Sequence, residues 1–231
     1  MPISLKSTVA APVAAYGSLK SSIALMDFQP GTRSWTVPAG VKRIRLFVVG
    51  GGGYNQGCGG GYSEKTIDVT AGQVISYTVG APGISTATTG GTSSAGGLIS
   101  ATGGASTTGS PGVGSGGDIN TSGGHGSASA NYGGGSAAHA FGNGQDCQLY
   151  LGGGFSSGPD SYVDGWKIGL MPGFGYGDGA RYYQTSAVRA NPGLGGGGAP
   201  PSFSSSGGNG GGGGGPAGNG GPGLVGIEVV A

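Results

Sequence analysis

The stretch GGNGGGGGGPAGNGGPGLVGIEVV, residues 207–230, is almost entirely glycine and then becomes a short hydrophobic segment. Val225, Ile227 and Val229 alternate with other residues, which is typical of a β-strand with one buried face. A glycine tether has no need to end in such a strand. The stretch therefore predicts a glycine-rich segment that brings the chain back to a sheet formed earlier in the sequence.

Earlier residues supply the partners for this last strand. Alternating or β-branched runs predict strands at 32–37, 41–49, 61–69 and 73–80, with turns at 38–40 and 70–72. Their alternation places apolar side chains on faces that need a common core: Ile44, Leu46, Val48, Ile67, Val69, Ile75, Tyr77 and Val79. No segment has a capped helical repeat. The predicted fold class is mainly β, a small β-sandwich with very little α-helix.

Residues 81–222 form an excursion between the early strands and the last one, and they contain most of the chain's 61 glycines. In the final run, two of every three positions are almost exclusively glycine or alanine, and the third position tolerates Pro216 and Pro222. Polyproline-type helices have three residues per turn and no internal hydrogen bonds, so glycine would let neighbouring backbones bond to each other. We predict an inserted layer of packed polyglycine-type helices. A flexible glycine linker is the alternative.

The composition excludes some partners. Charged residues make up 8% of the chain and the formal net charge is +1, so clustered Lys and Arg for nucleic acid or an anionic membrane are lacking. No apolar run is long enough to insert into a membrane. Cys58 and Cys147 are too few for a disulfide scaffold, and a single bridge or two buried thiols both remain open.

Side chains are concentrated between residues 150 and 190. This region holds eight of the chain's eighteen aromatic residues together with several charges. Aromatic rings with guanidinium groups and carboxylates are typical of sites that bind sugars or protein loops. The predicted receptor-binding residues are Phe155, Tyr162, Trp166, Phe174, Tyr176, Arg181, Tyr182, Tyr183 and Arg189. A small satellite core over the glycine layer is the other interpretation.

Motifs for catalysis are weak. GFSSG at 154–158 matches a nucleophile elbow, but a turn follows it, and only His125 and His139 are present to act as a base. Asp160 and Asp164 are better explained as turn formers or hydroxyl acceptors than as a glycosidase pair. We expect no enzymatic activity, no catalytic residues, no metal and no cofactor.

Four stretches carry a resemblance to a known family: WTVPAGVKRIRLFVVGGGG, GGGYSEKTIDVTAGQVISYTVGAPG, GGLISATGG and the closing run quoted above. Over residues 32–110 and 193–231 the chain resembles the glycine-rich domains of bacteriophage tail fibres. More loosely, it resembles tail-fibre tip adhesins built on polyglycine helices. The resemblance implies a virion protein on a tail fibre or surface fibre, made in the host cytoplasm. It also implies an adhesin that binds a host-cell surface glycan or outer-membrane protein, with residues 150–190 in the loop role.

The expected organisation has two parts. Residues 1–31 form an N-terminal attachment arm, and residues 32–231 form the glycine-rich β-sandwich domain with its insertion at 81–222. We expect the arm to dock on another virion or tail-fibre protein, or on a neighbouring copy in a homotrimer. The alternative to an adhesin is a purely structural virion protein, such as a fibre segment, spacer or capsid decoration without receptor binding.

Overall fold

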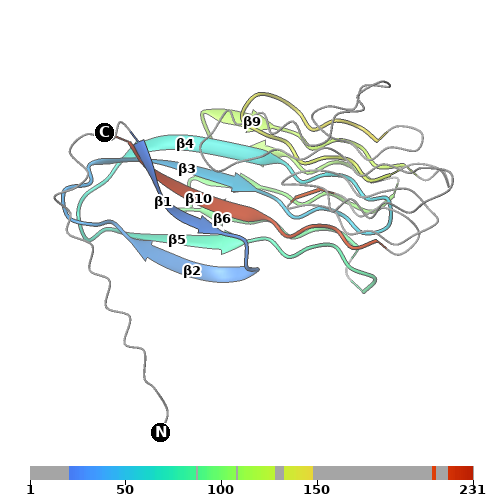
Figure 1. Ribbon diagram of the computed structural model, residues 1–231, viewed down its shortest axis with the longest axis horizontal. Helices are drawn as coiled ribbons and strands as arrows, with labels where there is room; N and C mark the ends of the chain where they lie inside the picture. The colour runs from blue at the N-terminus through green and yellow to red at the C-terminus, as the bar shows by residue number, and fades with distance from the viewer. Residues whose placement is uncertain are drawn as a thin grey trace, which may run out of the picture.

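Two five-stranded antiparallel sheets form one end of the protein (Figure 1). The computed structural model describes residues 21–86, 88–107, 109–127, 133–147, 210–211 and 218–230. Sheet A has the order β1-β10-β3-β4-β9, and sheet B the order β2-β5-β6-β7-β8. The strands are β1 (Ser21–Asp27), β2 (Gly31–Thr36), β3 (Arg43–Val49), β4 (Tyr62–Asp68), β5 (Val74–Val79), β6 (Ser93–Ala95), β7 (Ile99–Ala101), β8 (Gly114–Ser115), β9 (Ile119–Thr121) and β10 (Leu224–Val230). No helix occurs among these residues, so the prediction of a mainly β fold is confirmed.

The closing strand lies where the sequence predicts it, inside a sheet. β10 pairs with β3 on one side, with Ile227 opposite Leu46, and with β1 on the other side. The four predicted early strands correspond to β2, β3, β4 and β5, with ends that differ by one or two residues. The excursion is more than a glycine layer, however, because it also contributes β6, β7, β8 and β9.

β1 is a strand that the sequence analysis did not predict, since it placed no element before residue 32. Its residues pair antiparallel with β10, so that Leu25 lies opposite Ile227 and Asp27 opposite Val225. Removal of the whole 1–31 segment would therefore take a strand from sheet A. The attachment role of this segment remains a prediction, and residues 1–20 lie outside the described residues.

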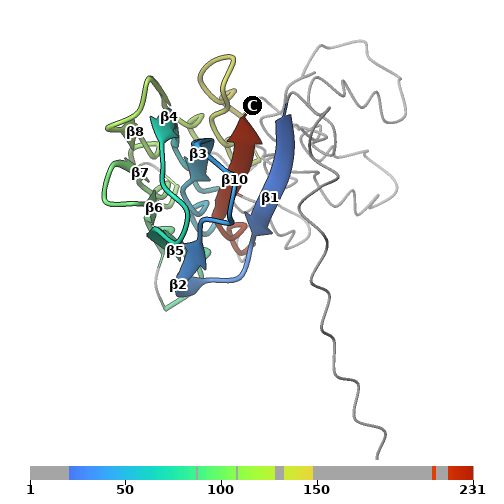
Figure 2. The ribbon, with the colours of Figure 1, turned by 90° about the vertical axis from the view of Figure 1, so that its left-hand side faces the viewer.

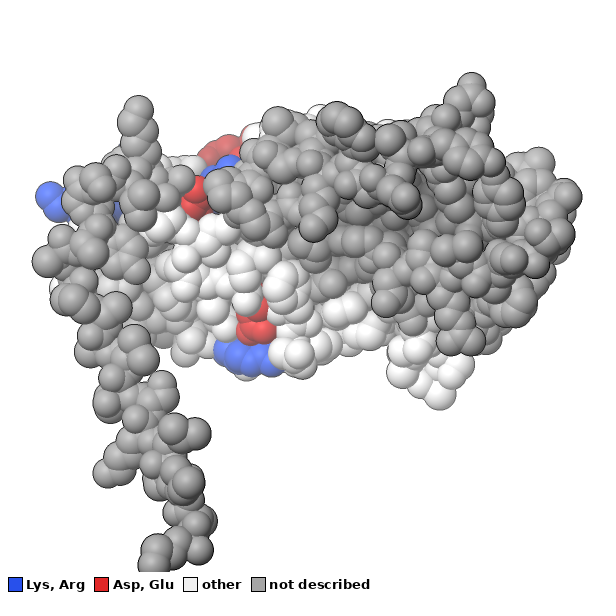
Figure 3. Space-filling model, in the orientation of Figure 1, with Lys and Arg blue, Asp and Glu red and all other residues white. Residues whose placement is uncertain are grey.

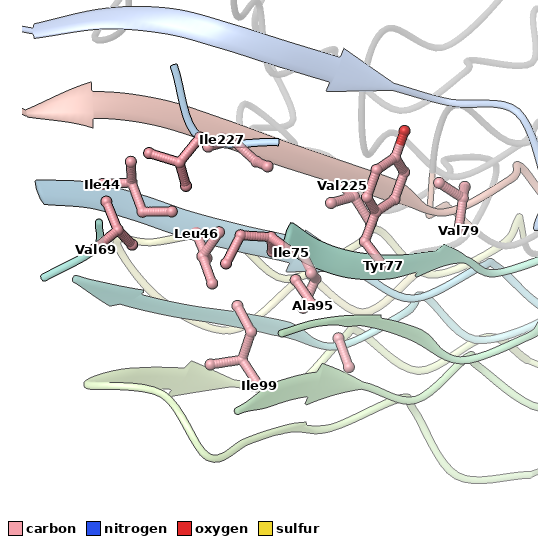
Figure 4. Close-up of a cluster of buried hydrophobic side chains, with 13 residues drawn as sticks. Ile44, Leu46, Val69, Ile75, Tyr77, Val79, Ala95, Ile99, Val225 and Ile227 are labelled. Carbon is pink, nitrogen blue, oxygen red and sulfur yellow. The ribbon is translucent and has the colours of Figure 1, made fainter. Parts of the chain in front are cut away.

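The core lies between the two sheets (Figures 2 and 4). The predicted alternation is confirmed: Ile44, Leu46 and Val48 of β3 and Ile227 of β10 are less than 1% exposed. Sheet B contributes a matching set that includes Ile75, Tyr77, Val79, Ala95 and Ile99. Burial of such side chains contributes about 1.5–3 kcal/mol each. This core fixes the ends of the strands from which the glycine-rich segments extend.

The outer face of sheet A carries a network of ion pairs over buried aromatic rings. Arg45 on β3 lies 2.6 Å from the carboxylate of Glu228 on β10 and 3.6 Å from that of Glu64 on β4. The Arg45 guanidinium also lies 5.7 Å from the centre of the Phe47 ring. Gly226 faces this ring across the strands, and a Cβ there would overlap the ring. In Figure 3, few charged side chains are visible on the described surface, and some of them lie next to charges of opposite sign.

The outer face of sheet B is uncharged and lined with hydroxyl groups. Thr32, Thr78, Ser94, Ser100 and Ser115 lie in one row across the five strands, because each is the register partner of the next. The hydroxyl oxygens of the first two residues are 2.9 Å apart, as are those of the last two. These polar side chains explain why this face can remain in contact with water while the opposite face is buried.

The glycine layer extends from the sheets at the other end of the protein (Figure 1). We use this name for the described residues within 50–61, 80–91, 102–113, 122–147 and 210–223. It begins at residue 50, directly after β3, whereas the sequence analysis placed its start at residue 81. Backbone hydrogen bonds between segments hold it together, in place of the continuous ladders of a sheet.

The hydrogen bonds of the layer repeat every three residues. Gly50, Gly51 and Gly52 donate to three different segments, to the carbonyl oxygens of Gly61, Gly91 and Gly221 at 2.9–3.0 Å. The next three residues, 53, 54 and 55, donate to the carbonyl oxygens of residues 58, 88 and 218, which lie three positions back in the same three segments. Residues 50–55 therefore bond to neighbours on three sides. The final run at 212–217, on which the prediction of polyglycine helices was based, lies outside the described residues.

Glycine is required in this layer because the backbones are too close together for side chains. A Cβ atom added at many of these positions would lie closer than 3.0 Å to a backbone atom of another segment, an approach that real Cβ atoms essentially never show. Six examples from the first hairpin are Gly50, Gly51, Gly53, Gly59, Gly60 and Gly61. None of these six has a positive φ. Glycine is therefore required at these positions because there is no space for a side chain, and not because the backbone conformation is unusual.

Replacement of one such glycine should therefore cost far more than replacement of a turn glycine. We expect Gly60→Ala to lower the free energy of unfolding by about 3 kcal/mol, because its Cβ would overlap the backbone of Gly50. Gly72→Ala is the control: it has open space but a φ of +82°, and we expect it to cost about 1 kcal/mol. Urea denaturation measures both values. Equal losses for the two variants would contradict the steric explanation.

Candidate functional site

The nine predicted receptor-binding residues, between Phe155 and Arg189, all lie outside the described residues. Their role remains a prediction. The same holds for GFSSG at 154–158 and for Asp160 and Asp164. Within the part of the chain that the structure describes, polar side chains meet in a different place, on the surface of the glycine layer.

That place is an open groove of about 750 Å³ over three neighbouring segments of the layer. Residues 122–125 lie between 110–113 and 143–146, joined by hydrogen bonds from Gly123 N to Gly112 O at 2.9 Å and from Gly144 N to Ser122 O at 2.8 Å. The residues that line the groove are Ser110, Pro111, Val113, Ser122, Gly123, His125, Asn143, Gly144, Gln145 and Asp146. Its size lies within the range of small-ligand sites.

Two side chains of the groove are fixed at one end by the backbone. The Oδ1 atom of Asn143 accepts a hydrogen bond from Ser122 N at 2.9 Å, and the Oδ1 atom of Asp146 accepts one from His125 N at 2.6 Å. The two donors, Ser122 and His125, are three residues apart in the chain, and so are the two acceptors, Asn143 and Asp146. These bonds therefore follow the three-residue repeat of the layer. The other polar atoms, Asn143 Nδ2 and Asp146 Oδ2, have no partner among the described residues.

The two histidines have different surroundings. His125 is exposed and lines the groove. His139 is buried, and its Nδ1 atom accepts a hydrogen bond from Phe141 N at 3.2 Å. Burial lowers the pKa of His139, because removal from water disfavours the charged imidazolium. The neutral form of the buried His139 side chain is therefore favoured.

The two cysteines are free thiols next to residues of the groove, and Cys58 is buried while Cys147 is partly exposed. Gly126 N donates to Cys58 Sγ at 3.4 Å, and Cys147 N donates to His125 O at 2.9 Å. Burial raises the pKa of Cys58, and it raises the pKa of Cys147 to about 12 with help from the nearby Asp146 carboxylate. Both cysteines are therefore protonated at neutral pH and are poor nucleophiles.

Among the described residues, no group of His, Cys, Asp and Glu side chains is arranged to hold a metal ion. In the same part of the chain, no helix has the length and apolar character that a membrane crossing requires.

The model of a family described as "glycine-rich domain" matches residues 28–230 of the chain. The chain belongs to this family. The match starts directly after β1 and includes the other nine strands and the whole glycine layer. No curated protein sequence matches the chain. The family description agrees with the glycine-rich part of the resemblance and says nothing of a phage or a fibre.

The groove was missed at the sequence level because its polar residues are far apart in the chain. A signal was present, however. Ser122 and His125 are three apart, as are Asn143 and Asp146, within stretches that are otherwise rich in glycine. A three-residue repeat places such positions on one side of a segment. Side chains kept at that spacing in a layer that mostly excludes them are candidates for binding.

The state of the thiols can be tested by alkylation. At pH 8 we expect Cys58 and Cys147 to react with iodoacetamide more than tenfold more slowly in the folded protein than in urea, since little thiolate is present and the sulfur atoms are partly covered. Ser85→Cys, at an exposed position, is the control and should react quickly in both conditions. Equal rates for the native cysteines in folded and unfolded protein would contradict this account, because the fold would then neither cover the sulfur atoms nor disfavour the thiolate.

Proposed function

We propose that this chain is a bacteriophage tail-fibre or virion-fibre adhesin, which binds a host-cell surface glycan or outer-membrane protein through side chains presented on a glycine-rich scaffold. The phage part of this proposal rests on the order of strand, glycine and strand that the chain shares with tail-fibre domains. The observation that carries the binding part is the groove, where a carboxylate and an amide are fixed on a backbone-bonded layer.

The construction of the layer favours recognition over catalysis. A site on a rigid support loses little conformational entropy when a ligand binds, so preorganisation improves affinity. We infer that the segments of the layer are polyglycine-type helices, because residues 50–55 bond to three neighbouring segments with a repeat of three. In the tail-fibre tip adhesins that the chain resembles, loops at the end of such a stack contact the host surface, and we propose the same role for residues 150–190.

A purely structural virion protein is the second candidate. It is favoured by the same layer, because closely packed glycine backbones give a durable spacer with few side chains to recognise anything. The groove argues against a spacer as the whole function. A spacer needs neither an anchored carboxylate nor the aromatic residues between 150 and 190.

Cell binding separates the two candidates. We expect labelled protein to bind some members of a panel of bacterial strains, and to bind less after surface polysaccharide is removed if the receptor is a glycan. Interface hot spots often cost about 2 kcal/mol when truncated, so Trp166→Ala or Arg181→Ala should weaken binding roughly thirtyfold. The melting temperature should stay the same if these side chains are exposed contacts.

A variant with both substitutions that is folded and binds as well as the parent would show that residues 150–190 are not the receptor site. Failure to bind any strain, combined with stable incorporation of the protein into virions, would favour the structural candidate instead.

A further inference from the structure

The groove provides hydrogen-bonding groups of both kinds at a defined spacing. Asp146 Oδ2 is an acceptor and Asn143 Nδ2 is a donor, while the Oδ1 atom of each residue is held by the backbone of the neighbouring segment. Because the two residues are three positions apart, their Cα atoms are separated by no more than about 10 Å. A hydroxyl group both donates and accepts, so a ligand with several hydroxyls can use both atoms.

The opposite side of the groove, formed by residues 110–113, adds two apolar side chains next to Ser110. Val113 is 49% exposed, and Pro111 lies close to it in the chain and also lines the groove. A sugar ring has an apolar face of C–H groups and a rim of hydroxyls, and this arrangement suits a groove with one apolar side and one polar side. The groove volume of about 750 Å³ is large enough for two linked sugar rings.

The charge of the groove residues favours neutral ligands over acidic ones. Among the residues that line the groove, Asp146 is the one with a formal charge when histidine is counted as neutral. No Lys or Arg among them would pair with a carboxylate or phosphate of a ligand. Sialic acids, uronic acids and phosphorylated sugars would therefore be repelled by Asp146, whereas a neutral hydroxyl would donate a charge-assisted hydrogen bond to its carboxylate.

We propose that this groove binds a neutral, disaccharide-sized part of a glycan, held between the Asp146 carboxylate and the Asn143 amide on one side and Val113 on the other. The residues named here differ from the nine predicted between Phe155 and Arg189, and the proposal does not depend on the chain being part of a virion. The affinity is modest because hydrogen bonds to water are exchanged for hydrogen bonds to the sugar. Several copies on one particle would raise the overall avidity.

Nuclear magnetic resonance titration of the full-length, ¹⁵N-labelled protein tests this proposal. The probes are the neutral disaccharides maltose, cellobiose and lactose, with 3′-sialyllactose as the acidic counterpart. We expect at least one neutral probe to shift the amide signals of Ser122, His125 and Gly144 in a saturable way. Sialyllactose should produce much smaller shifts at the same concentration.

Asp146→Asn is the decisive variant, because its side-chain oxygen can still accept the bond from His125 N. We expect it to weaken binding of the neutral probe roughly tenfold, since a charge-assisted hydrogen bond is lost. It should also reduce the discrimination against sialyllactose. Asp118→Asn is the matched control: Asp118 also accepts a backbone hydrogen bond, from Thr66 N at 3.1 Å, but does not line the groove.

Two results would overturn the proposal. One is the absence of saturable shifts at the groove with all three neutral probes. The other is tenfold weaker binding in Asp118→Asn but not in Asp146→Asn. If the disaccharides fail while cell binding persists and depends on Trp166 and Arg181, the groove proposal is wrong, and the adhesin proposal then rests on residues 150–190 in place of the groove. If the disaccharides bind to the groove and the protein binds no cells, the groove proposal stands and the adhesin proposal is wrong.

Discussion

The fold depends on the close approach of peptide backbones in the glycine layer. At Gly50 and Gly53, for example, the nearest atom to an added Cβ would be a carbonyl oxygen of another segment. Each missing side chain thus lets a Cα–H group point at a carbonyl, a contact that is weak but recurs between closely packed backbones. Because peptide N–H groups also bond across the segments, the layer satisfies its polar backbone without forming a regular sheet.

The two sheets serve this layer by fixing where its segments begin and end. Val49 ends β3 directly before Gly50, and Leu224 starts β10 directly after Gly223, whose amide donates to Gly80 O at 2.9 Å. The glycine segments contribute almost no apolar side chains of their own, so the hydrophobic driving force comes mainly from the core between the sheets. This is why a long run of glycine ends in a strand such as Leu224–Val230.

The sequence was sufficient for the strands with strong alternation and for the closing strand, because Ile and Val at every second position leave few other structures. It was insufficient for β6, β7 and β8, whose residues are mainly Ser, Ala and Gly and have little intrinsic preference for a strand. Their position is set by pairing in sequence: β6 pairs with β5, β7 with β6 and β8 with β7. The groove could not be predicted from the sequence either, because Asp146 and His125 are brought together by the packing of the layer and not by a local motif. The three-residue repeat, by contrast, was visible in the closing run.

The most direct test of this account is detection of the individual hydrogen bonds of the layer. In protein labelled with ¹⁵N and ¹³C, scalar couplings through hydrogen bonds identify the carbonyl that each amide bonds to. The account predicts couplings from the amides of Gly50, Gly51 and Gly52 to the carbonyls of Gly61, Gly91 and Gly221, together with slow hydrogen exchange at these amides. Exchange at the rate of an unfolded peptide, with no coupling between these pairs, would contradict it.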